Sequence, residues 1–322
     1  MSEEILKVRD LEVRFNTHEG IVRAVGGISY TVRKGQTLGI IGESGSGKSV
    51  SSMAVMGLIP MPPGEIADYS SINFMGRELS RLSTKELAPI RGQQISMIFQ
   101  DPMTCLNPFL KIETQMIEAL IHHKKVSKRE ALAKAQAMLE YVQVPDAGKR
   151  MKTYPHELSG GLRQRVMIAM ALTCDPQMIF ADEPTTALDV TVQAQILKLF
   201  REVKSSFDAG IVLISHDLGV VATECDHIIV MYAGRIVESG SPEEIFETPQ
   251  HPYTQGLKAS IPNIDGEKTE LAVIKGLPPD LRKLPDGCAF AERCPVVTDK
   301  CHKGDIPLKT IASGHEVRCL LA

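Results

Sequence analysis

A glycine-rich segment near the N-terminus constrains the fold of this chain more than any other feature. The segment Gly42–Ser49, with the sequence GESGSGKS, fits G-x-x-x-x-G-K-[ST], the pattern of a phosphate-binding loop. The apolar stretch Leu38–Ile41 before it is predicted to be a strand, and Ser49–Leu58 after it a helix. This order lets backbone N–H groups converge on a phosphate at the helix N-terminus. We therefore predict an α/β fold with a nucleoside triphosphate site.

Two residues of the loop have side chains suited to separate tasks. Lys48 would supply a positive charge to the β- and γ-phosphates, and Ser49 would offer its hydroxyl to Mg²⁺. A chance glycine-rich turn is the alternative, and the flanking strand and helix argue against it. The predicted nucleotide-binding residues of the loop are Gly42, Ser44, Gly45, Ser46, Gly47, Lys48 and Ser49.

Two adjacent carboxylates follow a second apolar strand. The run Met178–Phe180 leads through Ala181 into Asp182 and Glu183. Removing both carboxylates from water is costly unless a cation is near. We interpret Asp182 as a ligand of Mg²⁺ through water and Glu183 as the base that polarises the attacking water. A plain acidic pair between strand and loop is the alternative, which the phosphate loop makes weak.

Strand-like and helical segments alternate along most of the chain. This rhythm is typical of an α/β fold with a buried parallel sheet, while the first two segments alternate apolar and polar residues like half-buried strands. Prolines recur after Glu247, so we place a domain boundary near residue 248, between 1–248 and 249–322. The other predicted strands are Ile5–Phe15, Ile21–Val32, Ile95–Phe99, Ile211–Ile214 and Ile228–Met231, and the other predicted helices Ile112–Val142 and Leu162–Leu172.

Composition excludes several classes of protein. The 322 residues allow about two domains, and the net charge of −3 gives no basic field to hold nucleic acid. No uncharged apolar run approaches the ~18 residues of a membrane span, and the acidic start Met1–Glu4 does not fit a signal peptide. We expect a cytosolic protein whose membrane contact comes only through partners.

Three further segments complete an ordered set with the loop and the acidic pair. They are Gln100 after the 95–99 strand, Leu158–Gly161 before a predicted helix, and His216 after the 211–214 strand. The set resembles the ATP-binding-cassette (ABC) ATPases over roughly the first three quarters of the chain. The resemblance implies a RecA-like core, an antiparallel β-subdomain and an inserted helical subdomain at about residues 101–158.

The resemblance also implies roles for the new residues. Gln100 would ligate Mg²⁺ and sense a transmembrane partner, and His216 would contact the γ-phosphate of ATP. The helix start formed by Ser159, Gly160 and Gly161 would reach the γ-phosphate on an opposite subunit, so the unit would be a dimer with two ATPs at its interface.

Three other positions follow from the same resemblance. Asp189 would lie in the loop that joins the two ATP sites. Leu162 stands where the family most often has Gln; the backbone N–H groups remain, so we expect function to survive. Phe15 is the candidate for stacking on adenine, and a buried strand aromatic is its alternative interpretation.

More specific stretches indicate the kind of cassette. Fused membrane helices, long coiled coils and a second cassette are lacking, which leaves the separate ATPase subunit of an importer. The stretches Phe99–Pro108, Tyr154–Gly161, Ala181–Thr191 and His251–Thr254 resemble the oligopeptide and dipeptide importers. Nickel and antimicrobial-peptide importers share much of this pattern and stay as alternatives. A nucleic-acid-linked cassette, with the C-terminal cysteines as a zinc module, is disfavoured by the charge and by the lack of a coiled coil. A non-hydrolysing cassette is disfavoured by the presence of Lys48, Glu183 and His216.

The importer resemblance implies a set of partners and a location. The partners would be a sister ABC ATPase forming a heterodimer, two transmembrane permease subunits and an extracytoplasmic peptide-binding protein. The chain would lie peripherally at the cytoplasmic face of the inner membrane.

Four of the seven cysteines crowd the C-terminus: Cys288, Cys294, Cys301 and Cys319. In a reducing compartment such a group favours a metal over disulfides. Four thiolates suit zinc or a [4Fe–4S] cluster; the tight C-x₂₋₄-C pairs of structural zinc are missing, and some peptide-importer ATPases of this kind carry the cluster. We predict [4Fe–4S], with zinc and unmetallated thiols as alternatives. His302 and His315 could substitute as ligands, but we expect solvated surface histidines. The tail has little apolar mass for a core, so we expect the metal to staple it.

Overall fold

The computed structural model describes residues 3–186, 188–260 and 273–322. Contacts divide the chain into two compact units, each assembled from separate stretches of sequence. The first unit comprises Met1–Ile5, Val32–Gln36 and Arg81–Ile214, and the second comprises Leu6–Thr31, Thr37–Ser80 and Ser215–Ala322. Within the described ranges, no helix has both the length and the apolar character needed to cross a membrane.

Three parallel strands form the centre of the first unit. β8 (Met178–Asp182) lies between β7 (Ile95–Ile98) and β9 (Gly210–Ile214). Every residue of these strands is buried, as expected for a parallel sheet covered on both faces. The three predicted strands are confirmed. Because parallel strands end at one edge of the sheet, the residues that follow β7 and β8 are brought close together.

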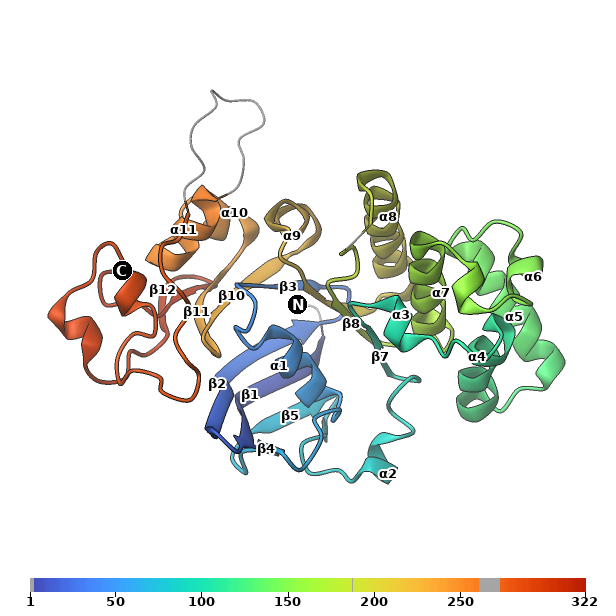
Figure 1. The fold of residues 1–322 in the computed structure, drawn as a ribbon, viewed down its shortest axis with the longest axis horizontal. Helices are drawn as coiled ribbons and strands as arrows, with labels where there is room; N and C mark the ends of the chain where they lie inside the picture. Colours follow the sequence, from blue (N-terminus) through green and yellow to red (C-terminus); the bar gives the residue numbers. More distant parts are fainter. Residues whose placement is uncertain (1–2, 187, 261–272) are drawn as a thin grey trace. The chain divides into compact units, whose positions relative to one another are not determined.

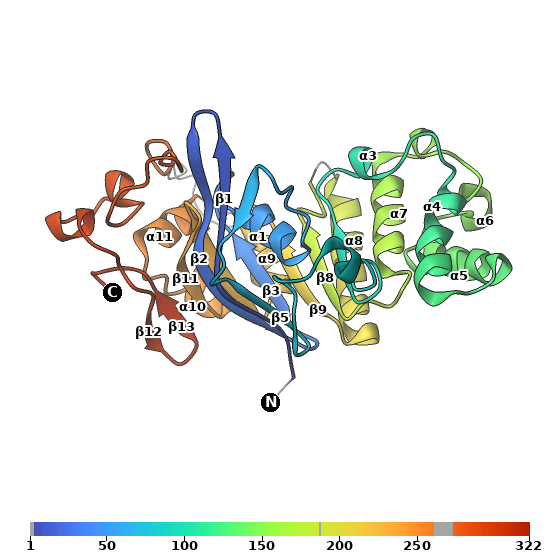
Figure 2. The same ribbon diagram turned by 90° about the horizontal axis from the view of Figure 1, so that it is seen from below.

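Helices make up most of the rest of the first unit. α4, α5 and α7 pack against one another and lie side by side in both ribbon views (green, Figures 1 and 2). The helices are α2 (Thr84–Leu87), α3 (Pro102–Cys105), α4 (Ile112–Ala119), α5 (Lys128–Tyr141), α6 (Ala147–Arg150), α7 (Gly160–Leu172) and α8 (Val190–Phe207), with a π-helical turn at Leu120–Lys124 and a 3-10 turn at Pro155–Glu157.

The single helical stretch predicted over residues 112–142 is interrupted. The π-helical turn ends it at Lys125, whose φ of 52° is left-handed. Ser127 then starts α5 as the N-cap of a capping box, in which its hydroxyl accepts from the Glu130 N–H and the Glu130 carboxylate accepts from the Ser127 N–H. Helical periodicity continues through such a break, which explains why the sequence did not reveal it.

An antiparallel sheet forms the N-terminal part of the second unit. Its order is β2-β1-β5-β6, with β4 also paired to β1, and β1 runs antiparallel to β4 and β5. Figure 2 shows the long β1 and β2 as adjacent blue strands. The predicted antiparallel β-region is confirmed. The strands are β1 (Glu4–Thr17), β2 (Gly20–Arg33), β4 (Gly64–Ile66), β5 (Ser71–Phe74) and β6 (Arg77–Glu78).

Further strands of the second unit form a mixed arrangement. β3 is parallel to β10, and β10, β11, β13 and β12 follow one another in antiparallel pairs. These strands are β3 (Thr37–Ile41), β10 (His227–Tyr232), β11 (Arg235–Gly240), β12 (Lys309–Ala312) and β13 (His315–Val317). The helices are α1 (Lys48–Val55), α9 (Leu218–Glu224), α10 (Pro242–Phe246) and α11 (Pro252–Ala259), with 3-10 turns at Ala291–Arg293 and Asp299–His302.

Residues 249–322, the predicted second domain (the C-terminal extension), have more of a core than their composition suggested. β13 extends the strand order of the cassette by pairing with β11, and Tyr253, Phe290 and Val317 are buried. His315 is only 4% exposed, and its Nε2 lies 2.8 Å from Glu238 Oε1; the expectation of a solvated histidine is wrong there, because β13 turns the ring inward. His302 is exposed, as expected.

Candidate functional site

The phosphate loop requires glycine at two of its positions. Gly42 has φ 147°, and a Cβ there would lie 2.1 Å from the carbonyl oxygen of Met231 on β10. Gly47, the N-cap of α1, has φ 98°, and its Cβ would lie 2.3 Å from the carbonyl oxygen of Ala24 on β2. Neither site has room for a side chain, so the motif glycines are explained by close backbone packing as well as by conformation.

Lys48 is folded into the loop that it follows. Its Nζ donates to the carbonyl oxygens of Gly42 (2.7 Å) and Glu43 (2.9 Å), and its side chain is largely buried. The ammonium group therefore ties the end of the loop to its first two residues. Ser49 lies half-buried in the first turn of α1, and Ser44 and Gly45 are exposed.

The acidic pair ends β8 in the first unit, as predicted. Asp182 is buried as the last residue of the strand. Glu183 has φ 47°, a left-handed conformation rarely adopted by a non-glycine residue. Its N–H donates to the carbonyl oxygen of Ile214 at the end of β9 (2.9 Å). Such a backbone conformation is found where surrounding structure enforces it, commonly at functional sites.

Gln100 and Glu183 meet at this edge of the sheet. Gln100 Nε2 donates to Glu183 Oε2 at 2.8 Å, and Thr186 Oγ1 donates to the same oxygen at 2.9 Å. Two donors on one carboxylate oxygen fix its orientation. The structure thus joins two residues that the sequence placed on different strands.

The residues predicted to reach the γ-phosphate of an opposite subunit lie at an exposed helix start. Ser159 is the N-cap of α7, and Gly160 and Gly161 are its first residues. Ser159 and Gly160 are exposed, and the Ser159 side chain makes no capping hydrogen bond. In the same unit, Asp189 caps α8, since its Oδ1 accepts from the Val192 N–H at 3.0 Å.

The remaining nucleotide candidates belong to the second unit. His216 is exposed in the turn before α9, next to Asp217, whose Oδ1 accepts from the N–H groups of Gly219 and Val220. Phe15 lies half-buried on β1, in register with Gly64 of β4. The position of Phe15 fits a strand aromatic as well as a stacking platform.

Side chains of the C-terminal extension reach the phosphate loop. Arg293 Nη1 and Nη2 donate to the two carboxylate oxygens of Glu43 at 2.7 and 2.9 Å. Tyr253 Oη accepts from the Glu43 N–H at 2.8 Å. Sequence reasoning missed Arg293 and Tyr253; its only signal was the family-like stretch that contains Tyr253.

Among the described residues, the C-terminal cysteines lie near one another but are not arranged as a metal site. All seven cysteines lie in the described ranges, and none forms a disulfide. Within those ranges, no three or more His, Cys, Asp or Glu side chains are arranged to hold a metal ion. Burial raises the pKa of Cys288, and the neighbouring Cys294, Cys301 and Cys319 raise it further, so the four thiols share one neighbourhood. Their arrangement does not by itself support the cluster.

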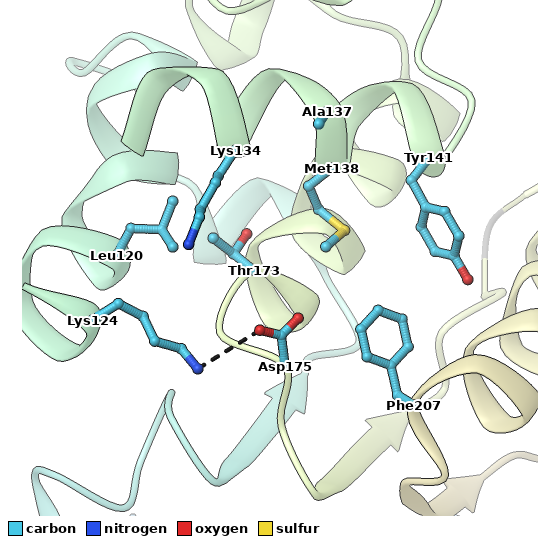
Figure 3. A pocket seen from close by; sticks show the side chains of 9 residues that line it. All are labelled: Leu120, Lys124, Lys134, Ala137, Met138, Tyr141, Thr173, Asp175 and Phe207. Carbon is cyan, nitrogen blue, oxygen red and sulfur yellow. Dashed lines mark ion pairs between the residues drawn. The ribbon is translucent and has the colours of Figure 1, made fainter. Parts of the chain in front are cut away.

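A separate pocket of about 380 Å³ lies in the first unit and contains none of the predicted nucleotide residues (Figure 3). Lys124 and Asp175 form an ion pair of 3.7 Å across it. Tyr141 and Phe207 meet edge to face at 6.1 Å on its other side. Its lining comes from the π-helical turn, α5 and the ends of α7 and α8.

Comparisons with known proteins agree with the fold and the motifs. The sequence model of the family "ABC transporter" matches residues 25–186, and that of "Oligopeptide/dipeptide transporter, C-terminal region" matches residues 237–301. The chain is 52% identical to the dipeptide transport ATP-binding protein DppD of Bacillus subtilis, across 99% of this chain and 95% of the relative. It is 51% identical to the oligopeptide transport ATP-binding protein OppD of Salmonella typhimurium, across 98% and 93%.

A solved structure supports the same assignment. The dimeric ATP-binding cassette MJ0796, in a post-hydrolysis state bound to ADP and Pi, superposes with a TM-score of 0.67 at 25% identity, across 74% of this chain and 99% of the other. The predicted cassette fold is therefore confirmed. With the loop, the acidic strand end and the C-terminal match on one chain, the protein belongs to the ABC transporter ATPases, in the group that carries the oligopeptide/dipeptide transporter C-terminal region.

Proposed function

We propose that this chain hydrolyses ATP to drive import of oligopeptides or dipeptides. The observation that carries the proposal is the identity of about half of all residues with peptide-transport ATP-binding proteins along nearly their whole length. That match includes the C-terminal region as well as the cassette. ATP and Mg²⁺ are the cofactors expected of an ABC ATPase.

The phosphate loop would bind the nucleotide through its backbone N–H groups and Lys48. Ser49, Gln100 and Asp182 would hold Mg²⁺, which would neutralise charge on the phosphates. Glu183 would accept the proton of the water that attacks the γ-phosphorus, as the bond to the β-phosphate oxygen breaks and ADP and phosphate leave. Support for Glu183 comes from the hydrogen bonds that aim its carboxylate, donated by Gln100 and Thr186.

Assembly with other subunits would complete the site. The exposed start of α7, with Ser159, Gly160 and Gly161, would bind the γ-phosphate held by a sister ATPase, and Asp189 would lie between the two sites. His216 would contact the γ-phosphate, and Phe15 would stack on adenine. Support comes from the dimeric state of the similar cassette MJ0796 and from the anion-binding character of a helix N-terminus.

The transporter would place the chain at the cytoplasmic face of the inner membrane. Two permease subunits would contact the helical subdomain, proposed at about residues 101–158 of a cassette that ends near residue 248. An extracytoplasmic protein would deliver the peptide. Residues 249–322 would form the extension typical of the peptide group.

The four C-terminal cysteines would hold a [4Fe–4S] cluster, with zinc or free thiols as the competing states. The support is the shared neighbourhood of the four thiols, although their arrangement in this structure does not meet that of a metal site. Anaerobic purification followed by measurement of iron, sulfide and zinc decides among the three. About four irons per chain and absorption near ~400 nm would support the cluster.

Reconstitution of the transporter tests the main proposal. The chain, its permeases and its sister ATPase in liposomes should hydrolyse ATP faster when the binding protein is loaded with peptide. Accumulation of labelled peptide should depend on ATP and Mg²⁺. Stimulation by nickel and not by peptide would overturn the proposed substrate class and leave the ATPase assignment intact.

A further inference from the structure

One peptide group of the phosphate loop is held at both ends. The carbonyl oxygen of Gly42 accepts from Lys48 Nζ at 2.7 Å, and the N–H of Glu43, in the same peptide plane, donates to Tyr253 Oη at 2.8 Å. The two bonds point in opposite directions because a trans peptide sets its C=O and N–H on opposite sides. Rotation of this peptide would break both bonds. Tyr253 therefore helps to hold the Gly42–Glu43 peptide with its carbonyl oxygen toward Lys48.

The side chain of Glu43 is also fixed by the extension. Arg293 grips both carboxylate oxygens in a bidentate pair, and its own side chain is only 6% exposed. This hydrogen bonding to Glu43 raises the pKa of Arg293, whose guanidinium is charged at any ordinary pH. A carboxylate within a loop that receives phosphate groups would repel them. The partly buried pair removes that repulsion and restrains the loop at the same time.

An aromatic cluster holds Arg293 and Tyr253 in place. The rings of Tyr232, Tyr253 and Phe290 lie 4.6 to 5.4 Å apart, centre to centre. The guanidinium carbon of Arg293 lies 5.7 Å from the Tyr232 ring centre and 5.8 Å from that of Phe290, within the range of cation–π attraction. Arg293 Nε also donates to the carbonyl oxygen of Lys275 at 3.0 Å. The two residues that hold Glu43 are thus packed within a cluster of buried aromatic rings.

We propose that the C-terminal extension braces the phosphate loop, with Arg293 and Tyr253 as positioning residues for nucleotide binding. The proposal rests on the proposed role of the loop in binding ATP. Neither residue would touch the nucleotide. Both would act through Glu43, by keeping the loop in the shape that binds phosphate and by neutralising its one carboxylate.

A double-mutant cycle on the full chain tests the brace. The variants are Arg293→Met, Glu43→Gln and the pair together, with ATP affinity measured by titration in the presence of Mg²⁺. Arg293→Met should weaken ATP binding about tenfold, the scale of losing hydrogen bonds to a charged group. Glu43→Gln alone should change affinity less, and adding it to Arg293→Met should recover much of the loss, because it removes the unpaired carboxylate.

Two further variants separate a specific brace from general loosening. Tyr253→Phe should weaken ATP binding severalfold, since it removes only the hydroxyl that accepts from Glu43. Arg282→Met is the matched control: it removes an exposed arginine of the extension that pairs with Asp280 and Glu19, and it should leave ATP affinity unchanged. In the assembled transporter, the brace variants should raise KM for ATP more than they lower kcat.

The outcomes distinguish the brace from the loop assignment. If Arg293→Met and Tyr253→Phe keep ATP affinity within twofold while Lys48→Ala loses it, the brace is wrong and the phosphate loop stands. Absence of rescue by Glu43→Gln would also contradict the brace, because loss of packing alone is not restored by neutralising Glu43. If Lys48→Ala binds ATP normally, the loop assignment itself fails.

Discussion

The phosphate loop and the acidic end of β8 are held by residues from different parts of the chain. Glu183 is held by near neighbours on the same parallel sheet edge, Gln100 and Thr186, and by the end of β9. Glu43 is held by Arg293 and Tyr253, from a segment more than two hundred residues further along the chain. The Glu183 carboxylate thus depends on neighbours close to it in the fold, while the loop depends partly on a segment distant in sequence. Damage to each should therefore affect a different step.

The largest effect is expected at the carboxylate. Glu183→Gln keeps the shape of the side chain but would remove the proposed base, so kcat for ATP hydrolysis should fall about 10³-fold. ATP affinity should stay near normal, because the loop is untouched. Phosphate release by the assembled transporter, with ATP titration of the variant, measures both. Near-normal hydrolysis would end the assignment of Glu183 as the base.

A substitution in the phosphate loop should weaken ATP binding and should not slow the chemical step. Lys48→Ala removes the ammonium that closes the loop and would contact phosphate, so ATP affinity should fall about 10²-fold. A melting curve without nucleotide provides the control for folding. If the variant lost only kcat, the contrast between the two regions would be false.

Acid should loosen the support of the phosphate loop. Burial lowers the pKa of His251 to about 4, and its Nδ1 accepts from the Tyr253 N–H at 3.1 Å. The unfolded state, with an ordinary pKa near 6.5, binds the proton more readily, so stability is full above pH 6.5 and is lost as the pH falls toward 4. At pH 5 the loss should be about 2 kcal/mol relative to pH 7.

Denaturant unfolding of the wild type and of His251→Asn at both pH values measures this term. The variant should be less stable at pH 7 but should lose less between pH 7 and pH 5. An identical pH dependence in the two proteins would show that other groups cause the acid sensitivity.

The smallest effect is expected from one hydrogen-bond donor to Glu183. Thr186→Val removes the hydroxyl that donates to Glu183 Oε2 and leaves the Gln100 bond in place. We expect kcat to fall about threefold, the scale of one net hydrogen bond, with ATP affinity unchanged. A loss as large as that of Glu183→Gln would mean that Thr186 is more than a support.

The sequence predicted those features that depend on short-range pattern. The loop motif, the buried strands and the carboxylates at the end of β8 are all local, and the meeting of Gln100 with Glu183 follows from the geometry of a parallel sheet. The break between α4 and α5 escaped because apolar spacing continues across it. The burial of His315 could not be predicted because that residue lies on a short strand with a weak sequence pattern. The hydrogen bonds from Arg293 to Glu43 could not be predicted because 250 residues separate the two.

The separation of Glu43 and Arg293 along the chain has a consequence for how these two positions vary among relatives. Glu43 and Arg293 act as one pair although they are encoded far apart in the gene. Replacing either residue alone leaves the charge of the other, partly buried, without its partner. Across relatives, substitutions at these two positions should be correlated. A chimera that joins this cassette to the extension of a distant relative near residue 248 should keep the native ATP affinity only where the donor supplies an arginine at the matching place.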